Sequence, residues 1–283
     1  MADRLALGIV ATLIAAAAPA AAVARAPSVR LWWIHYRSFH GEIRSAIVVL
    51  PRWYGPRRDP PIPLVISPHG SGVEPRDNAQ RWGDLPALGR FAVVNPEGQG
   101  AKLELYAWGS PAQISDLARM PSIVRRALPW LRLAPHRVYA VGGSMGGQET
   151  LLLAAEHPRL LAGAISFDAP TNMTARYAAF PHLLQRLARR EIGTARDAWA
   201  DRSPIDYARK LAFSGVPLEI WWSTRDEVVA DQAAQSGRLF GEIRRLNPRA
   251  PVLQVVGRWR HTAEMRPSGD LPAALRWLRL LPR

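Results

Sequence analysis

The chain has 283 residues, of which 48% are hydrophobic and 21% are charged, so it is long enough for one large α/β domain and too apolar to be disordered throughout. It contains no cysteine, which excludes disulfide bonds, thiolate metal ligands and cysteine nucleophiles. The net charge of +14 comes mainly from arginines, which are scattered along the chain and cluster only in short pairs. Because the sequence has neither a longer basic run nor the motif of a known nucleic-acid-binding domain, it predicts no specific nucleic-acid site.

The first 24 residues have the pattern of a secretory signal peptide. An apolar stretch, Leu5–Ala18, follows a basic residue and is short for a membrane span. Two small-residue motifs that suit a signal peptidase come next, at Ala20–Ala22 and Ala22–Ala24. An uncleaved anchor is the alternative interpretation. We predict cleavage, a secreted location (extracellular or associated with the cell envelope) and no transmembrane segment in the mature protein.

Eight short apolar runs follow along the chain. They are Arg30–Tyr36, Ile43–Leu50, Ile62–Ser67, Phe91–Gly100, Arg137–Gly143, Leu161–Asp168, Val216–Ser223 and Ala250–Gly257. Continuous apolar runs without clean alternation are typical of strands buried on both faces of a parallel sheet.

Helical patterns occupy the gaps between the later runs. They cover Ala112–Leu128, Gly147–His157, Val229–Leu246 and Leu271–Leu281, and Pro121 is expected to end or kink the first. Strands that alternate with helices of this length predict right-handed βαβ units in a three-layer α/β domain. The stretch from Ala169 to Leu211 is too long for one crossover, so we predict a lid insertion over residues 169–212.

One serine lies between two pairs of glycines in "VYAVGGSMGGQETLLLAA". Residues 142–146 match G-x-S-x-G, with a strand pattern before them and a helical pattern after them. In this context the serine sits on a strained turn at the carboxyl edge of the sheet, and the glycines let the neighbouring backbones approach. We predict that Ser144 is a nucleophile, and a tight turn with an inert serine is the alternative.

A serine nucleophile needs a general base, and three histidines follow Ser144. His157 lies at the end of the next helix, where a capping role is expected, and His182 lies in the predicted lid. His261 follows the last strand, where a loop can bring its imidazole onto Ser144. The chain order Ser, acid, His of this architecture therefore predicts His261 as the base.

Two carboxylates compete for the role of the acid that orients the histidine. Asp226 follows the strand Val216–Ser223 at the same sheet edge as Ser144, and its neighbour Glu227 is a weaker candidate. Asp168 ends the preceding strand and is the rival, because the acid can come from one strand earlier. We predict Asp226, with Asp168 fixing the start of the lid through hydrogen bonds to backbone.

An oxyanion hole requires two N–H donors. The backbone N–H of Met145, directly after the nucleophile, is the first. The loop "SPHGSG" after an earlier strand supplies the second, which we assign to the backbone of Ser71, with Gly70 as the alternative. His69 is then expected to brace this loop.

Aromatic residues in loops are candidates for the wall of a substrate pocket. We predict substrate contacts for Trp108 and, in the proline-rich loop, for Trp53 and Tyr54; anchoring of these loops against the sheet is the alternative.

The motifs "SPHGSG", "GGSMGG", "STRDEVV" and "RWRH", with "RSPIDYARKL" before the acid strand, together resemble the α/β-hydrolase superfamily. The resemblance extends over nearly all of the mature chain and is greatest for secreted serine esterases and peptidases of the prolyl-oligopeptidase-like and polyhydroxyalkanoate-depolymerase-like groups. It implies a three-layer α/β-hydrolase fold in residues 25–283, with a mostly parallel twisted sheet, helices on both faces and a lid. It also implies Ser-His-Asp acyl transfer with no metal and no cofactor.

We therefore expect a secreted serine hydrolase that acts on small-molecule or polymeric carboxylic esters through an acyl-enzyme. A serine peptidase of the prolyl-oligopeptidase-like type is the second hypothesis. A non-catalytic binding module on the same fold is a hypothesis from a different class. The sequence leaves the acyl preference and the oligomeric state open.

Overall fold

The computed structural model describes residues 28–56, 59–98, 108–178 and 196–283, together with residues 182, 185, 186 and 189. The predicted signal peptide, residues 1–24, lies outside the described residues. So does part of the predicted lid, and both remain predictions. Among the described residues, no helix has the length and apolar character that crossing a membrane requires.

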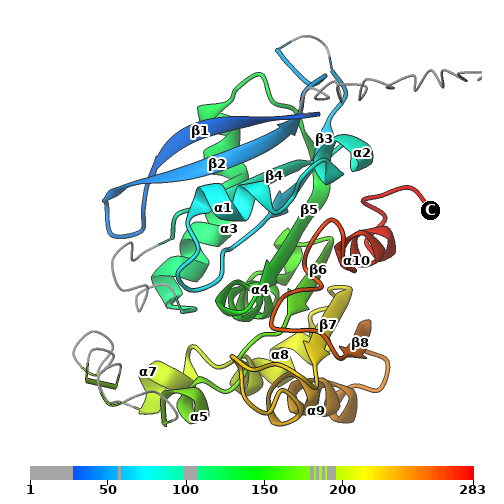
Figure 1. Cartoon of the computed structure of the whole chain (residues 1–283). Helices are drawn as coiled ribbons and strands as arrows, with labels where there is room; N and C mark the ends of the chain where they lie inside the picture. Colours follow the sequence, from blue (N-terminus) through cyan, green and yellow to red (C-terminus); the bar gives the residue numbers. More distant parts are fainter. Residues whose placement is uncertain are drawn as a thin grey trace, which may run out of the picture.

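A single sheet of eight strands forms the middle of the described part of the chain, in the order β1-β2-β4-β3-β5-β6-β7-β8 (Figure 1). The strands are β1 (Val29–Arg37), β2 (Ile43–Pro51), β3 (Ile62–Ile66), β4 (Ala92–Pro96), β5 (Leu133–Gly143), β6 (Gly163–Phe167), β7 (Leu218–Ser223) and β8 (Val252–Gly257). The pairs β1–β2 and β2–β4 are antiparallel, and all remaining neighbours are parallel. Each of the eight predicted strands is present.

Helices cover both faces of this sheet. The longer ones are α3 (Pro111–Ala127), α4 (Met145–Glu156), α9 (Arg238–Leu246) and α10 (Leu271–Trp277), and the six-residue helix α8 (Ala208–Phe213) packs beside α4 and α9. The shorter elements are α1 (Pro75–Gln80), α2 (Leu85–Gly89), α5 (Met173–Ala178), α7 (Arg196–Ala200), the 3-10 helices η1 (Pro158–Leu160) and η2 (Pro204–Tyr207), and the π-helix η3 (Ala233–Gly237).

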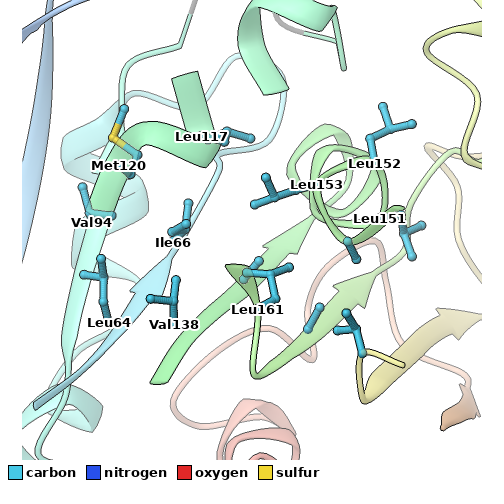
Figure 2. Close-up of a cluster of buried hydrophobic side chains, with 14 of the residues drawn as sticks. Leu64, Ile66, Val94, Leu117, Met120, Val138, Leu151, Leu152, Leu153 and Leu161 are labelled. Atoms are coloured by element: carbon cyan, nitrogen blue, oxygen red, sulfur yellow. The ribbon is translucent and has the colours of Figure 1, made fainter. Parts of the chain in front are cut away.

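The two sides of the sheet carry separate hydrophobic cores. On one face, α3, α4, α8 and α9 pack their apolar side chains against the strands. Figure 2 shows part of this core, in which Leu117 of α3 and Leu153 of α4 lie over Ile66 and Val138 of the sheet. On the other face, α1, α2 and α10 form the second core. These layers confirm the predicted three-layer, mostly parallel architecture.

Three local features differ from the predictions. Of the two effects expected from Pro121, an end or a kink of the helix, the first does not occur, because α3 continues to Ala127; Pro121 is buried there, so packing outweighs one lost backbone hydrogen bond. Helices α1 and α2 were not predicted, because six and five residues are too short to show a helical period. The last part of the predicted lid, α8, buries Ala208 and Leu211 in the main core.

Candidate active site

Ser144 occupies the turn between β5 and α4. Its backbone has φ 58° and ψ −126°, a conformation that is strained for any residue with a side chain. The Ser144 N–H donates to the Phe167 carbonyl at 2.8 Å, and its carbonyl accepts from the Gln148 N–H at 3.0 Å. These two bonds fix the serine at the carboxyl edge of the sheet, where the sequence predicted it.

The glycines around Ser144 are required by close backbone approach. A Cβ on Gly142 would lie 2.3 Å from the Gly146 carbonyl oxygen, and a Cβ on Gly146 would lie 2.2 Å from the Pro68 carbonyl oxygen. Neither distance is compatible with a side chain. The turn therefore brings β5, α4 and the loop after β3 into contact directly at the serine.

His261 and Asp226 contact each other although 35 residues separate them. The Nδ1 atom of His261 lies 2.8 Å from Oδ2 of Asp226, whose side chain is 1% exposed. An Nδ1–H that donates to this carboxylate leaves Nε2 as the acceptor nitrogen. Nε2 is buried and has no hydrogen bond with any described residue, so it is available to take a proton.

The Asp226 carboxylate is held by a dense set of donors. Its Oδ1 accepts from the N–H groups of Val228 and Val229 at 2.8 and 2.9 Å, and its Oδ2 accepts from Nε2 of Gln232 at 2.9 Å. Burial alone would raise the pKa of Asp226, but the hydrogen bonds from His261, Gln232 and Val229 bring it below its ordinary value. The Asp226 carboxylate is therefore ionised at neutral pH, and its hydrogen bonds fix its orientation.

The rival acid makes different contacts. Asp168 is fully buried, and its two oxygens accept from the backbone N–H groups of Ser223 and Thr262 at 2.9 and 2.8 Å. Burial raises the pKa of Asp168. The third candidate, Glu227, is on the surface, where it pairs with Arg260 at 3.0 Å. Of the three carboxylates, the structure brings Asp226 onto His261 Nδ1.

Ligand atoms of Asp168, Asp226 and His261 lie within 4.8 Å of one another, a spacing that could hold a metal ion. The hydrogen bonds of these atoms favour a different use. His261 Nδ1 is engaged with Asp226, and both oxygens of Asp168 accept backbone N–H groups. We therefore interpret the cluster as a His261–Asp226 pair beside a carboxylate, Asp168, that is bound to backbone.

The loop after β3 lies against the serine. A Cβ on Gly70 would be 3.7 Å from Cβ of Ser144, so the backbone of Gly70, the alternative to Ser71 as second oxyanion donor, is adjacent to the nucleophile. His69 is buried below it, with Nδ1 2.8 Å from the Gly70 carbonyl and Nε2 2.9 Å from the Glu97 carbonyl. This geometry fits a bracing histidine. Met145 begins α4, and the oxyanion roles of its N–H and of the Ser71 N–H remain predictions.

Two of the three predicted substrate contacts, Trp108 and Tyr54, have different environments. The Trp108 carbonyl accepts from Nε2 of Gln148 at 3.2 Å and Nη1 of Arg202 at 3.3 Å, which places this residue beside the nucleophile helix. Tyr54 is 1% exposed, and its hydroxyl accepts from the Arg132 N–H at 3.1 Å, just before β5 begins. The structure therefore puts Tyr54 in the core at the amino end of β5, and does not bring it to Ser144.

Two residues near the candidate site were not predicted. Gln232 donates to Asp226, and Glu264, 2% exposed, is buried beside Asp168. Neither belongs to a motif, and both meet their partners through loops. The only signal available in the sequence was the position of Glu264 three residues after His261.

Part of the chain matches a known protein family. Residues 128–266 match the prolyl oligopeptidase family (Peptidase_S9), and this span contains Ser144, Asp226 and His261. Among curated proteins, none matches the sequence.

Several solved structures have a similar fold. An S-formylglutathione hydrolase from Staphylococcus aureus is 15% identical, with a TM-score of 0.68 over 89% of this chain and 99% of that one. A fluorophosphonate-binding serine hydrolase from Staphylococcus aureus is 14% identical, with a TM-score of 0.69 over 89% and 98%. An acylaminoacyl peptidase from Pyrococcus horikoshii is 15% identical, with a TM-score of 0.65 over 89% of this chain and 41% of that one. At these identities, the likeness shows the fold.

Proposed function

We propose that this chain is a secreted serine hydrolase of the α/β-hydrolase superfamily that cleaves carboxylic esters through an acyl-enzyme intermediate. The observation that carries this proposal is the 2.8 Å contact between His261 Nδ1 and Asp226 Oδ2. It leaves a buried and unpaired Nε2 for the hydroxyl of Ser144, which the strained turn presents at the same edge of the sheet.

In the proposed mechanism, His261 Nε2 takes the proton of Ser144 as Oγ attacks the ester carbonyl carbon. The imidazolium that forms is stabilised by the ionised Asp226. The negative charge on the carbonyl oxygen is met by the N–H groups of Met145 and Ser71. His261 then gives its proton to the departing alkoxide, and a water molecule, deprotonated by the same nitrogen, releases the acid and restores Ser144.

A fluorophosphonate should label the purified protein on Ser144, because it reacts with a serine whose proton is removed by an adjacent base. Intact-mass and peptide mass spectrometry would locate the adduct. Ser144→Ala should abolish labelling and hydrolysis of p-nitrophenyl esters. Ser71→Ala is the matched control and should retain both, since the proposed contribution of Ser71 is its backbone N–H.

Labelling of another residue, or none under conditions in which the protein is folded, would contradict the proposal. Equal ester turnover by the wild type and Ser144→Ala would instead favour the non-catalytic binding module.

Peptide hydrolysis is the second candidate, and the match of residues 128–266 to a peptidase family favours it. Esters rank first because this chain covers 90% of an esterase from Pyrococcus furiosus that has a similar fold, but only 41% of the acylaminoacyl peptidase. We expect a higher kcat/KM on short-chain or feruloyl esters than on aminoacyl-anilides in parallel assays. A clear preference for the anilides would reverse this ranking.

Export is proposed from the sequence of residues 1–24. The fluorophosphonate-labelled protein should appear in the medium or the cell envelope, with an N-terminus created after Ala22 or Ala24. A labelled protein that retains Met1 inside the cell would argue against export.

A further inference from the structure

One buried carboxylate connects the two loops that carry the proposed acid and base. Ser223, whose N–H donates to Asp168, is the last residue of β7 and comes three residues before Asp226. Thr262, whose N–H also donates to Asp168, directly follows His261. Asp168 therefore fixes the start of one loop and the centre of the other, and neither of these two hydrogen bonds involves Ser144 or Nε2 of His261.

The backbone at this point needs such support. Asp168 has φ 44° and Thr262 has φ 53°, both in the left-handed region that residues with side chains rarely adopt. Such conformations persist where surrounding contacts hold them. A further link joins the same loops, because Oγ of Ser223 donates to the Trp259 carbonyl.

Glu264 lies next to Asp168 and has an unusual environment. Neither of its carboxyl oxygens receives a hydrogen bond from another described residue, although Glu264 is only 2% exposed. Burial and the neighbouring Asp168 raise the pKa of Glu264 to about 9. The titratable groups that act on this pair are Asp226, which raises both pKa values, and His261, which lowers that of Asp168.

These contacts determine which carboxyl holds the proton. Asp168 accepts N–H groups from two other residues, and such bonds favour the ionised form, whereas no other described residue donates to Glu264. A protonated Glu264 can donate its O–H to Asp168, which satisfies both side chains.

We propose that Asp168 and Glu264 form a proton-sharing pair that positions His261 and Asp226 for catalysis, an inference that rests on the proposed function. The pair consists of positioning residues: it keeps the imidazole and its acid in register while the chemistry proceeds on other atoms. At alkaline pH the loss of the shared proton places two negative charges side by side, and their repulsion loosens the link between the loops.

Glu264→Gln tests the shared proton without reference to activity. The folded-state pKa of Glu264 lies above its ordinary value of 4.5, so the wild type loses stability as the pH rises from 4.5 toward about 9. The amide cannot ionise and still donates to Asp168. The difference in Tm, variant minus wild type, should therefore be more positive at pH 9 than at pH 5. An equal difference at both values would overturn the proposal.

Positioning is tested by the rate of fluorophosphonate labelling. The wild-type rate should fall as the pH passes about 9, and that of Glu264→Gln should not. Asp168→Asn leaves one of the two N–H groups without an acceptor, so kcat and the labelling rate should fall about 10- to 100-fold with KM little changed. The positioning role would be overturned if the labelling rate of Glu264→Gln fell above pH 9 as in the wild type. An undiminished labelling rate in Asp168→Asn would overturn it as well.

Glu219→Gln is the matched control. Glu219 is buried in β7, where burial raises its pKa to about 7, but it accepts from Trp221 Nε1 at 2.8 Å and is not part of the pair. This variant should change the pH dependence of Tm and leave the labelling rate at pH 9 unchanged. If the wild type is not labelled at all, the proposed function fails, while the Tm comparison of Glu264→Gln still decides whether the proton is shared.

Discussion

Asp226→Asn should lower kcat about 10⁴-fold while the protein stays folded. The amide can present an N–H to His261 in place of a carboxylate oxygen, so the imidazole moves its proton to Nε2 and can no longer accept the proton of Ser144. The negative charge that stabilises the imidazolium is lost as well. Hydrolysis of a p-nitrophenyl ester measures the loss, with circular dichroism to verify the fold.

Glu227→Gln is the matched control for this change. It removes the adjacent carboxylate, which is exposed and pairs with Arg260, and a surface ion pair of this kind contributes little to stability. We expect kcat to stay within about twofold of the wild type, because this carboxylate has no bond to His261. If Asp226→Asn keeps most of the activity while Asp168→Asn is inactive, the assignment is reversed, and Asp168 is the acid that orients His261.

Most of the fold was predictable because its signals are local. β3, β4 and β7 are buried along their whole length, so they appear in the sequence as mainly apolar runs, which Glu219 interrupts in β7 and Asn95 in β4. The alternation of such runs with helices then restricts the topology. The short helices α1 and α2 leave no comparable pattern in the sequence.

Two rules made the main residues of the candidate site predictable: the chain order Ser, acid, His, and the position of these residues at the carboxyl edge of the sheet. These two rules select Ser144, Asp226 and His261, and the structure brings Asp226 and His261 together. They also leave Asp168 as a rival, because both aspartates follow strands at the same edge. Only the side-chain contacts, one to an imidazole and the other to backbone N–H groups, distinguish them.

Residues whose partners are distant in sequence could not be predicted. Tyr54 was interpreted from its proline-rich loop, but its position depends on Arg132 and on Trp130, whose ring centroid is 6.4 Å away. Glu264 depends in the same way on Asp168, almost a hundred residues earlier in the chain. In both cases tertiary packing decides the role, and no local pattern reports it.

Gly146→Ala should damage both the fold and the site. The new Cβ would lie 2.2 Å from the Pro68 carbonyl oxygen and 3.0 Å from that of His69, so the backbone must move. Overpacking of this kind costs about 1–3 kcal/mol or more in the free energy of unfolding. The displaced segment continues into Gly70 and the proposed oxyanion donor Ser71, and loss of one such donor lowers kcat by about 10²- to 10³-fold.

The same substitution at another helical glycine separates this clash from the general effect of glycine in a helix. Gly241 lies in α9, and a Cβ there would have no heavy atom within 4 Å. Gly241→Ala should therefore stabilise the protein by about 0.5–1 kcal/mol, as expected for an exposed helix interior, and leave kcat unchanged. Urea unfolding and ester hydrolysis measure the two effects on each variant. Equal behaviour of the two variants would mean that the turn at Ser144 can relax away from the loop after β3, and that the contact between them is not what positions the oxyanion donors.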